Sequence, residues 1–140
     1  KTMSEHHSLY NTPPTYSWYI AGLVLDWLKR KGGVSTIYEI NKRKAKKIYT
    51  IIDNHPDFYI NKVHPDCRSI MNVTFYLRDE QLTSLFLEQA EKANLTNLRG
   101  HRASGGVRAS IYNAMPEEGV DLLVAFMADF AKKHERRLAS

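Results

Sequence analysis

The stretch Ile70-Met71-Asn72-Val73-Thr74-Phe75-Tyr76-Leu77 decides the fold of this 140-residue chain. Val73, Phe75 and Leu77 stand two residues apart, so they fall on one face of an extended segment. Most of the stretch consists of β-branched and aromatic residues, which favour strands. We therefore expect residues 70–77 to form a strand with one apolar face turned to a core.

An amphipathic helix is expected directly after this strand. Asp79 is a suitable N-cap, and the helix should end near Asn94. Its apolar positions recur at helical spacing and are Leu82, Leu85, Phe86, Ala90 and Ala93.

Two more candidate strands, residues 95–98 and 107–112, precede a last helix. Pro116 suits a first helical position, and Glu117 and Glu118 suit the positive end of the helix dipole. One face of this helix would carry Val120, Leu123, Val124, Met127, Phe130 and Ala131. Its C-terminal end would carry the basic residues Lys132, Lys133, Arg136 and Arg137.

Two helices and a short strand are predicted before the central strand. Residues 15–31 are apolar around much of the helical circumference and stop at Gly32-Gly33. A helix this apolar indicates burial against something missing from this chain. In the second helix one side would carry Ile37, Ile40, Ile48, Ile51 and Ile52. The basic residues Lys42, Arg43, Lys44, Lys46 and Lys47 would lie largely on the other side. Residues 58–60 resemble a short strand.

Strands interleaved with amphipathic helices indicate a layered α/β domain, a small sheet covered by helices. The composition, 43% apolar and 25% charged, is that of a globular protein. With Cys67 as the single cysteine, no disulfide can form within the chain, which favours a reducing, cytoplasmic compartment. No segment approaches the roughly 18 apolar residues of a membrane span, and we expect no membrane partner.

A glycine-flanked basic segment, Gly100-His101-Arg102-Ala103-Ser104-Gly105-Gly106-Val107-Arg108, is the candidate anion site. Arginine forks match carboxylate and phosphate oxygens, and the glycines allow a tight bend that would aim Arg102 and Arg108 at one ligand. The alternative is a basic surface turn. A Walker loop and a dinucleotide fingerprint are both excluded by sequence, and we expect no metal site because His6-His7 lacks ligand spacing.

Three motifs together make the chain resemble the phosphoserine aminotransferases. They are Asn11-Thr12-Pro13-Pro14-Thr15, Met71-Asn72-Val73-Thr74-Phe75, and the segment from Gly100 through Arg108 to Ala114. The resemblance runs in order along nearly the whole chain. It implies the C-terminal portion of a fold-type I enzyme, with residues 1–33 ending the large domain and residues 34–140 forming the small domain.

The resemblance also implies roles. Such an enzyme is a cytoplasmic homodimer that moves an amino group between glutamate and 3-phosphohydroxypyruvate, giving phosphoserine and 2-oxoglutarate in serine biosynthesis, with pyridoxine biosynthesis in some relatives. Asn11 and Thr12 would contact the phosphate of pyridoxal 5'-phosphate in the other subunit. His101 and Arg102 would face the substrate's phosphate or distal carboxylate, and Arg108 would hold the α-carboxylate.

What the resemblance leaves outside this chain is the lysine that anchors the cofactor. The lysines present fall mainly on polar helical faces or near helix ends, and we expect none of them to anchor it. These 140 residues alone are therefore expected to be inactive and to contain no catalytic residue. The alternative function is a non-catalytic basic module in which residues 42–47 and 99–108 bind nucleic acid or another polyanion.

Overall fold

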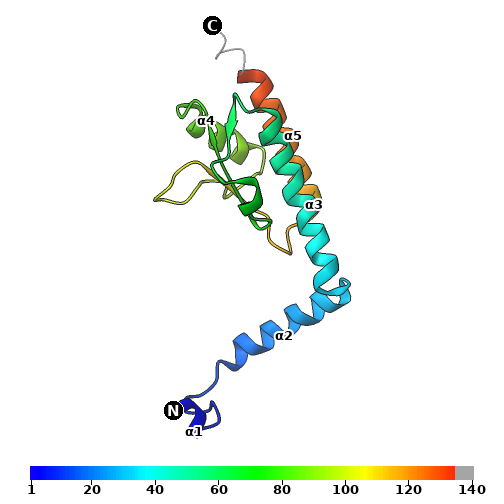
Figure 1. Cartoon of the computed structure of the whole chain (residues 1–140), viewed down its shortest axis with the longest axis vertical. Coiled ribbons are helices and arrows are strands. Elements are labelled where there is room, and N and C mark those ends of the chain that lie inside the picture. The colour runs from blue at the N-terminus through cyan, green and yellow to red at the C-terminus, as the bar shows by residue number, and fades with distance from the viewer. Residues whose placement is uncertain (135–140) are drawn as a thin grey trace. The chain divides into compact units, whose positions relative to one another are not determined.

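The computed structural model describes residues 1–134 and divides into two compact units, Lys1–Ile37 and a second that begins at Tyr38 (Figure 1). The elements in order are α1 (Thr2–Glu5), α2 (Thr15–Arg30), α3 (Gly33–Asn54), β1 (Tyr59–Ile60), η1 (Pro65–Cys67), β2 (Asn72–Leu77), α4 (Leu82–Lys92), β3 (Val107–Ser110) and α5 (Glu117–His134). Arg136 and Arg137 lie outside the described residues. No helix in the described part is long and apolar enough to cross a bilayer.

The first unit contains α1, the proline-rich loop and α2. Helix α2 ends where predicted, because Gly32 and Gly33 both adopt positive φ, at 96° and 78°. No residue of α2 is buried, and its aromatic side chains Tyr16, Trp18 and Tyr19 are among the most exposed apolar groups of the chain. The predicted burial of this helix against another part of the protein stays a prediction.

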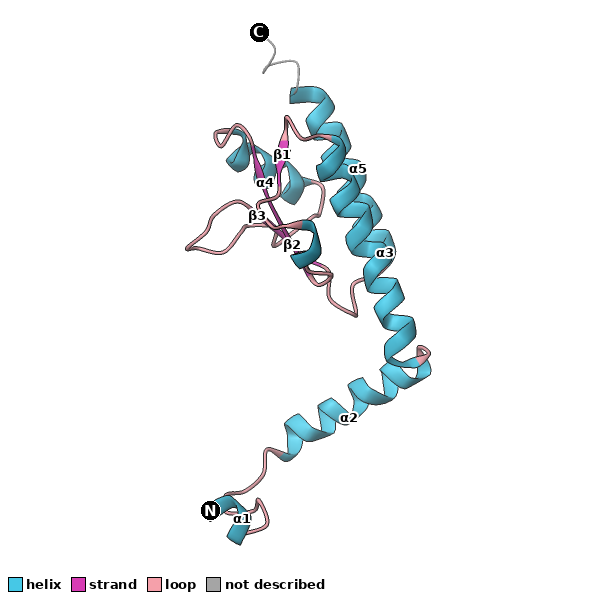
Figure 2. Ribbon diagram, in the orientation of Figure 1, coloured by secondary structure: helices cyan, strands magenta, loops and turns pink. Residues whose placement is uncertain are grey.

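The second unit is built on an antiparallel three-stranded sheet in the order β1-β2-β3 (Figure 2). Val73, Phe75 and Leu77 of β2 are buried, which confirms the predicted inward face. Register places Val73 opposite Ala109 and Phe75 opposite Val107, so the buried faces of β2 and β3 coincide. The expected small sheet of an α/β domain is therefore present.

Three helices share one hydrophobic core with this face of the sheet. The aromatic rings of Tyr59, Phe75, Phe86 and Phe130 meet edge to face at its centre, and the centroids of the contacting pairs lie 5.1 to 6.4 Å apart. The predicted apolar stripe of α5 is confirmed, because all its members but Val124 are buried and Val124 packs on the core. The fold is thus two-layered, with helices over one face of a short sheet.

Two local predictions fail. Residues 95–98 form no strand, because Asn94 and Asn97 both take φ near 61°, which breaks an extended path; only an isolated bridge joins Arg99 to Val107. Asp79 is not the N-cap of α4, whose cap position is Gln81. Asp79 instead accepts a hydrogen bond from the Gln81 backbone N–H at 3.0 Å in the turn before the helix.

Candidate functional site

The segment between Gly100 and Gly106 is a closed turn whose shape depends on glycine. The Gly100 N–H donates to the Gly106 carbonyl at 2.9 Å, and the Gly105 N–H donates to the His101 carbonyl at 2.8 Å. Gly105 and Gly106 both have positive φ, at 66° and 69°. The predicted tight bend is therefore confirmed, and it places residues 101–104 at its tip.

Alanine at position 100 is expected to open this turn. A Cβ there would stand 1.9 Å from the Gly105 carbonyl oxygen, which is backbone and must move. Gly105→Ala is the matched control, because its Cβ would meet nothing within 4 Å and only the positive φ is penalised, by about 1 to 2 kcal/mol. Denaturant unfolding of the intact protein should show a larger loss for Gly100→Ala than for Gly105→Ala, and equal losses would contradict the geometry.

The predicted site residues belong to three different segments of the chain. Asn11 and Thr12 lie exposed in the loop of the first unit. His101 and Arg102 lie exposed at the tip of the glycine turn, where His101 Nδ1 accepts from the Ala103 N–H at 3.2 Å. Arg108 lies within β3, opposite Thr74.

Arg108 lines a cavity of about 420 Å³, and the cavity wall includes neither His101 nor Arg102. Its Nε is buried and has no hydrogen-bond partner among the described residues. The cavity is formed by residues 94–98, the end of β3 with Ile111, Met115, and the first turns of α5. An arginine with an unused buried donor on the wall of a mainly apolar cavity is a strong candidate for binding an anion.

A buried lysine lies behind this cavity, and the sequence prediction for it was wrong. Lys44 was placed on the solvent side of its helix, but its exposed fraction is zero. Burial lowers the pKa of its amine, and the nearby Glu117 carboxylate raises it in part. The sequence does indicate this burial, because Lys44 stands four residues from both Ile40 and Ile48 and so falls on the apolar face of the helix.

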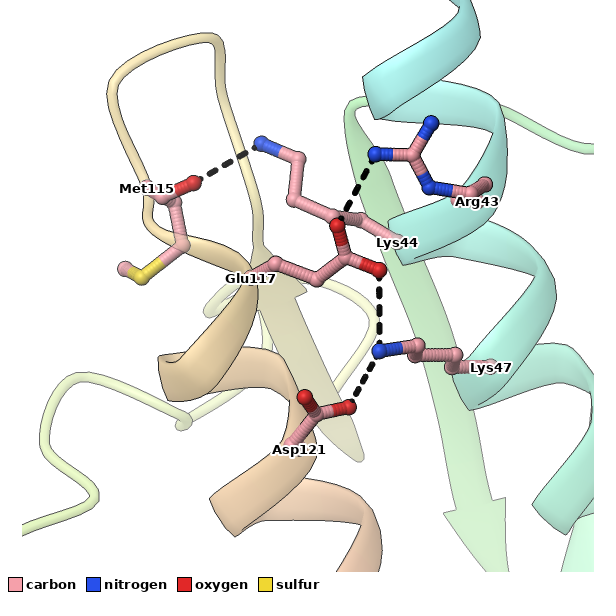
Figure 3. A network of polar contacts seen from close by, with 6 residues as sticks. All are labelled: Arg43, Lys44, Lys47, Met115, Glu117 and Asp121. Carbon is pink, nitrogen blue, oxygen red and sulfur yellow. Dashed lines mark hydrogen bonds and ion pairs between the residues drawn. The ribbon is translucent and has the colours of Figure 1, made fainter.

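The Lys44 amine donates hydrogen bonds to three backbone carbonyl oxygens of the segment between β3 and α5. The distances are 3.0 Å to Ile111, 2.8 Å to Tyr112 and 3.0 Å to Met115, the last of which Figure 3 shows. Three donors meet three acceptors, so the ammonium is fully satisfied inside the protein. The same helix contributes buried Asn41, whose amide donates to the Asn113 side chain at 2.7 Å.

The neighbouring cations tie α3 to the start of α5, so the two helices lie side by side (Figure 3). Glu117 accepts from Arg43 at 3.0 Å and pairs with Lys47 at 2.9 Å, and Lys47 also pairs with Asp121. The hydrogen bonds from Lys47 and Arg43 lower the pKa of Glu117 to about 2. Much of the basic run is thus neutralised within the fold.

The ion pairs of Glu117 should make stability fall in acid. Because the folded pKa of Glu117 lies below its ordinary value of 4.5, its stabilisation is present above that value and is lost as the pH falls towards about 2. Glu117→Gln should therefore lower the free energy of unfolding near neutral pH, and the difference from wild type should shrink between pH 4.5 and 2. Glu118→Gln, in the same helical turn but unpaired among the described residues, is the control for urea titrations at several pH values.

The family-model comparison matches residues 1–123 of the chain to "Aminotransferase class-V". The chain belongs to the class-V aminotransferase family. Within that family it is 56% identical to a phosphoserine aminotransferase of Hahella chejuensis and 52% identical to one of Buchnera aphidicola, over 96% of its own length in both cases. It spans 37% of the length of these relatives.

Solved structures agree with this class-V assignment. The phosphoserine aminotransferase of Bacillus circulans subsp. alkalophilus superposes with a TM-score of 0.89 at 42% identity, over 95% of this chain and 37% of that one. A pyridoxal-phosphate-bound phosphoserine aminotransferase of Trichomonas vaginalis gives 0.82 at 38% identity, over 90% of this chain and 36% of that one. The predicted family and α/β fold are therefore confirmed.

Proposed function

We propose that this chain is the C-terminal portion of a phosphoserine aminotransferase, which moves an amino group between glutamate and 3-phosphohydroxypyruvate. Identity of 52 to 56% to relatives of that name over 96% of the chain supports the assignment. Products would be phosphoserine and 2-oxoglutarate, as serine biosynthesis requires, and residues 1–33 would belong to the large domain.

The proposal rests mainly on the position of Arg108. Arg108 is partly buried and lines the cavity of about 420 Å³, and its Nε has no partner in the described part of the chain. A planar guanidinium binds a carboxylate through two parallel hydrogen bonds, so Arg108 would orient the α-carboxylate that all the substrates share. His101 and Arg102, exposed on the glycine turn, would meet the phosphate or distal carboxylate, the group that differs between substrates.

The cofactor would be pyridoxal 5'-phosphate, and the donor chemistry of the first unit fits its phosphate. Asn11 and Thr12 are exposed and make no side-chain hydrogen bond to any described residue, so an amide and a hydroxyl donor are free for phosphate oxygens. When bound, the cofactor supplies the electron sink that transamination needs. Homodimer formation would bring these two residues to the neighbouring subunit's cofactor.

The anchoring lysine would lie outside these 140 residues. Lys44 is the buried lysine that a search for an anchor would select, yet its three donors already meet three carbonyl oxygens. An amine held in this way is a structural cation and has no lone pair directed at a ligand. These residues would thus supply substrate binding and part of a cofactor site, in a cytoplasmic enzyme.

The alternative, a polyanion-binding module, gains no support from the basic run. Arg43 and Lys47 pair with carboxylates of α5, Lys44 is buried, and Lys42 pairs with Glu39. Cations engaged in this way contribute little to binding nucleic acid, which depends on free charge at the surface.

Substrate discrimination tests the proposed function. The full-length enzyme, saturated with pyridoxal phosphate, would be assayed with 2-oxoglutarate and either phosphoserine or serine. We expect kcat/KM to be at least about 100-fold higher for phosphoserine, because serine leaves the basic groups meant for the phosphate unpaired. Equal rates with the two amino acids, or no transfer from phosphoserine, would reject the assignment.

A further inference from the structure

The cavity that Arg108 lines has one wall made by the segment between β3 and α5. Ile111 and Met115 of this segment line the cavity together with Arg108. Lys44 does not line it, but donates to the carbonyl oxygens of Ile111 and Met115, both at 3.0 Å. One buried amine therefore holds two residues of the wall from behind.

At the start of this segment both backbone groups of Ile111 are hydrogen-bonded. The Ile111 N–H donates to the Met71 carbonyl at 2.9 Å, while the Ile111 carbonyl accepts from Lys44. Further along, Tyr112 accepts from Lys44 at 2.8 Å and Asn113 accepts from Asn41 at 2.7 Å. The donors come from one face of α3, which is continuous with the core through Ala45 and Ile48.

Burial makes this arrangement sensitive to small changes. Lys44 and Asn41 are the buried polar residues of the described core, with exposed fractions of 0% and 1%. The folded protein loses stability when a buried amine loses a hydrogen-bond acceptor. The three carbonyl oxygens are therefore confined to positions around the Lys44 nitrogen. A shift of the segment would lengthen several of these hydrogen bonds at once.

We propose that Lys44, assisted by Asn41, is a positioning residue for substrate binding: it holds the Ile111–Met115 wall at the distance from Arg108 that admits the α-carboxylate end of an amino acid. The proposal rests on the proposed function, because it takes the Arg108 cavity as the α-carboxylate site. Both amino-acid substrates carry that carboxylate, so loss of the clamp should weaken both alike.

Lys44→Met in the full-length enzyme is the direct test, since methionine keeps an unbranched apolar stem and removes the ammonium. We expect KM for phosphoserine and KM for glutamate each to rise about tenfold, with kcat within about twofold of wild type, because the lost interaction positions the ground state and transition state equally. Lys46→Met is the matched control, two residues away on the exposed side of α3, and should leave both KM values unchanged.

Asn113→Ala keeps the test decisive if Lys44→Met does not fold. Its side chain is exposed and accepts only the Asn41 bond among the described residues, so removing it loosens the wall and leaves the buried Asn41 amide without its acceptor, while Lys44 keeps all three of its own. A rise of about threefold in both KM values would support the proposal. Unchanged KM values in an active enzyme, or the same change in Lys46→Met, would overturn it, whereas a wild type inactive on phosphoserine would overturn the proposed function instead.

Discussion

Replacing Arg108 with lysine in the intact enzyme is expected to raise KM for phosphoserine and for glutamate about 10- to 150-fold. Lysine retains the positive charge but loses the planar fork, and about 1.5 to 3 kcal/mol is at stake in a charge-assisted bond to a buried site. Because every substrate carries the α-carboxylate, both KM values should rise together. Steady-state kinetics with each substrate varied in turn measures the effect.

Arg99→Lys provides the control for this substitution. Arg99 is exposed, and an isolated β-bridge pairs it with Val107, the residue before Arg108 in β3. It contributes no side chain to the Arg108 cavity, so its replacement should leave both KM values near those of wild type. An Arg108→Lys enzyme with wild-type KM values would remove Arg108 from the substrate site.

Truncating Phe86 to alanine is expected to lower the free energy of unfolding by about 3 to 5 kcal/mol, the range for deleting a buried aromatic side chain. Phe86 is fully buried and stands edge to face with Phe75 at 5.9 Å and with Phe130 at 5.1 Å between centroids. Its loss would leave a void between β2 and α5. Urea unfolding of the intact protein measures the change.

Leu122→Ala is the comparison for Phe86→Ala, because Leu122 lies on α5 with 65% of its surface exposed. Its truncation should cost less than about 1 kcal/mol, as for most surface substitutions. If Phe86→Ala lowered the free energy of unfolding by as little as Leu122→Ala, α4 would not pack on the core in the way described.

The elements with strong periodicity were predictable from sequence. Val73, Phe75 and Leu77 alternate with period two, and the α5 stripe from Val120 to Ala131 repeats with helical spacing, so side-chain burial follows directly from the pattern. Residues 95–98 were misread because the left-handed conformations of Asn94 and Asn97 depend on the turn geometry, which local composition does not report.

The candidate site was predictable only in its chemistry. Glycines and arginines of residues 100–108 indicated an anion site, and the turn exists, but sequence spacing could not show that Arg108 lines a cavity together with residues of α5. Lys44 was missed because a charged residue within a basic run is ordinarily solvated. Its acceptors, 67 to 71 residues away, become visible only in three dimensions.

The most direct measurement is a crystal structure of the full-length enzyme with phosphoserine bound. We predict the Arg108 guanidinium about 2.7 to 3.2 Å from the α-carboxylate oxygens and Arg102 within the same range of the phosphate, the ordinary lengths of such hydrogen bonds. Arg102 and Arg108 on separate faces of the molecule, with no shared ligand between them, would contradict the proposed substrate site.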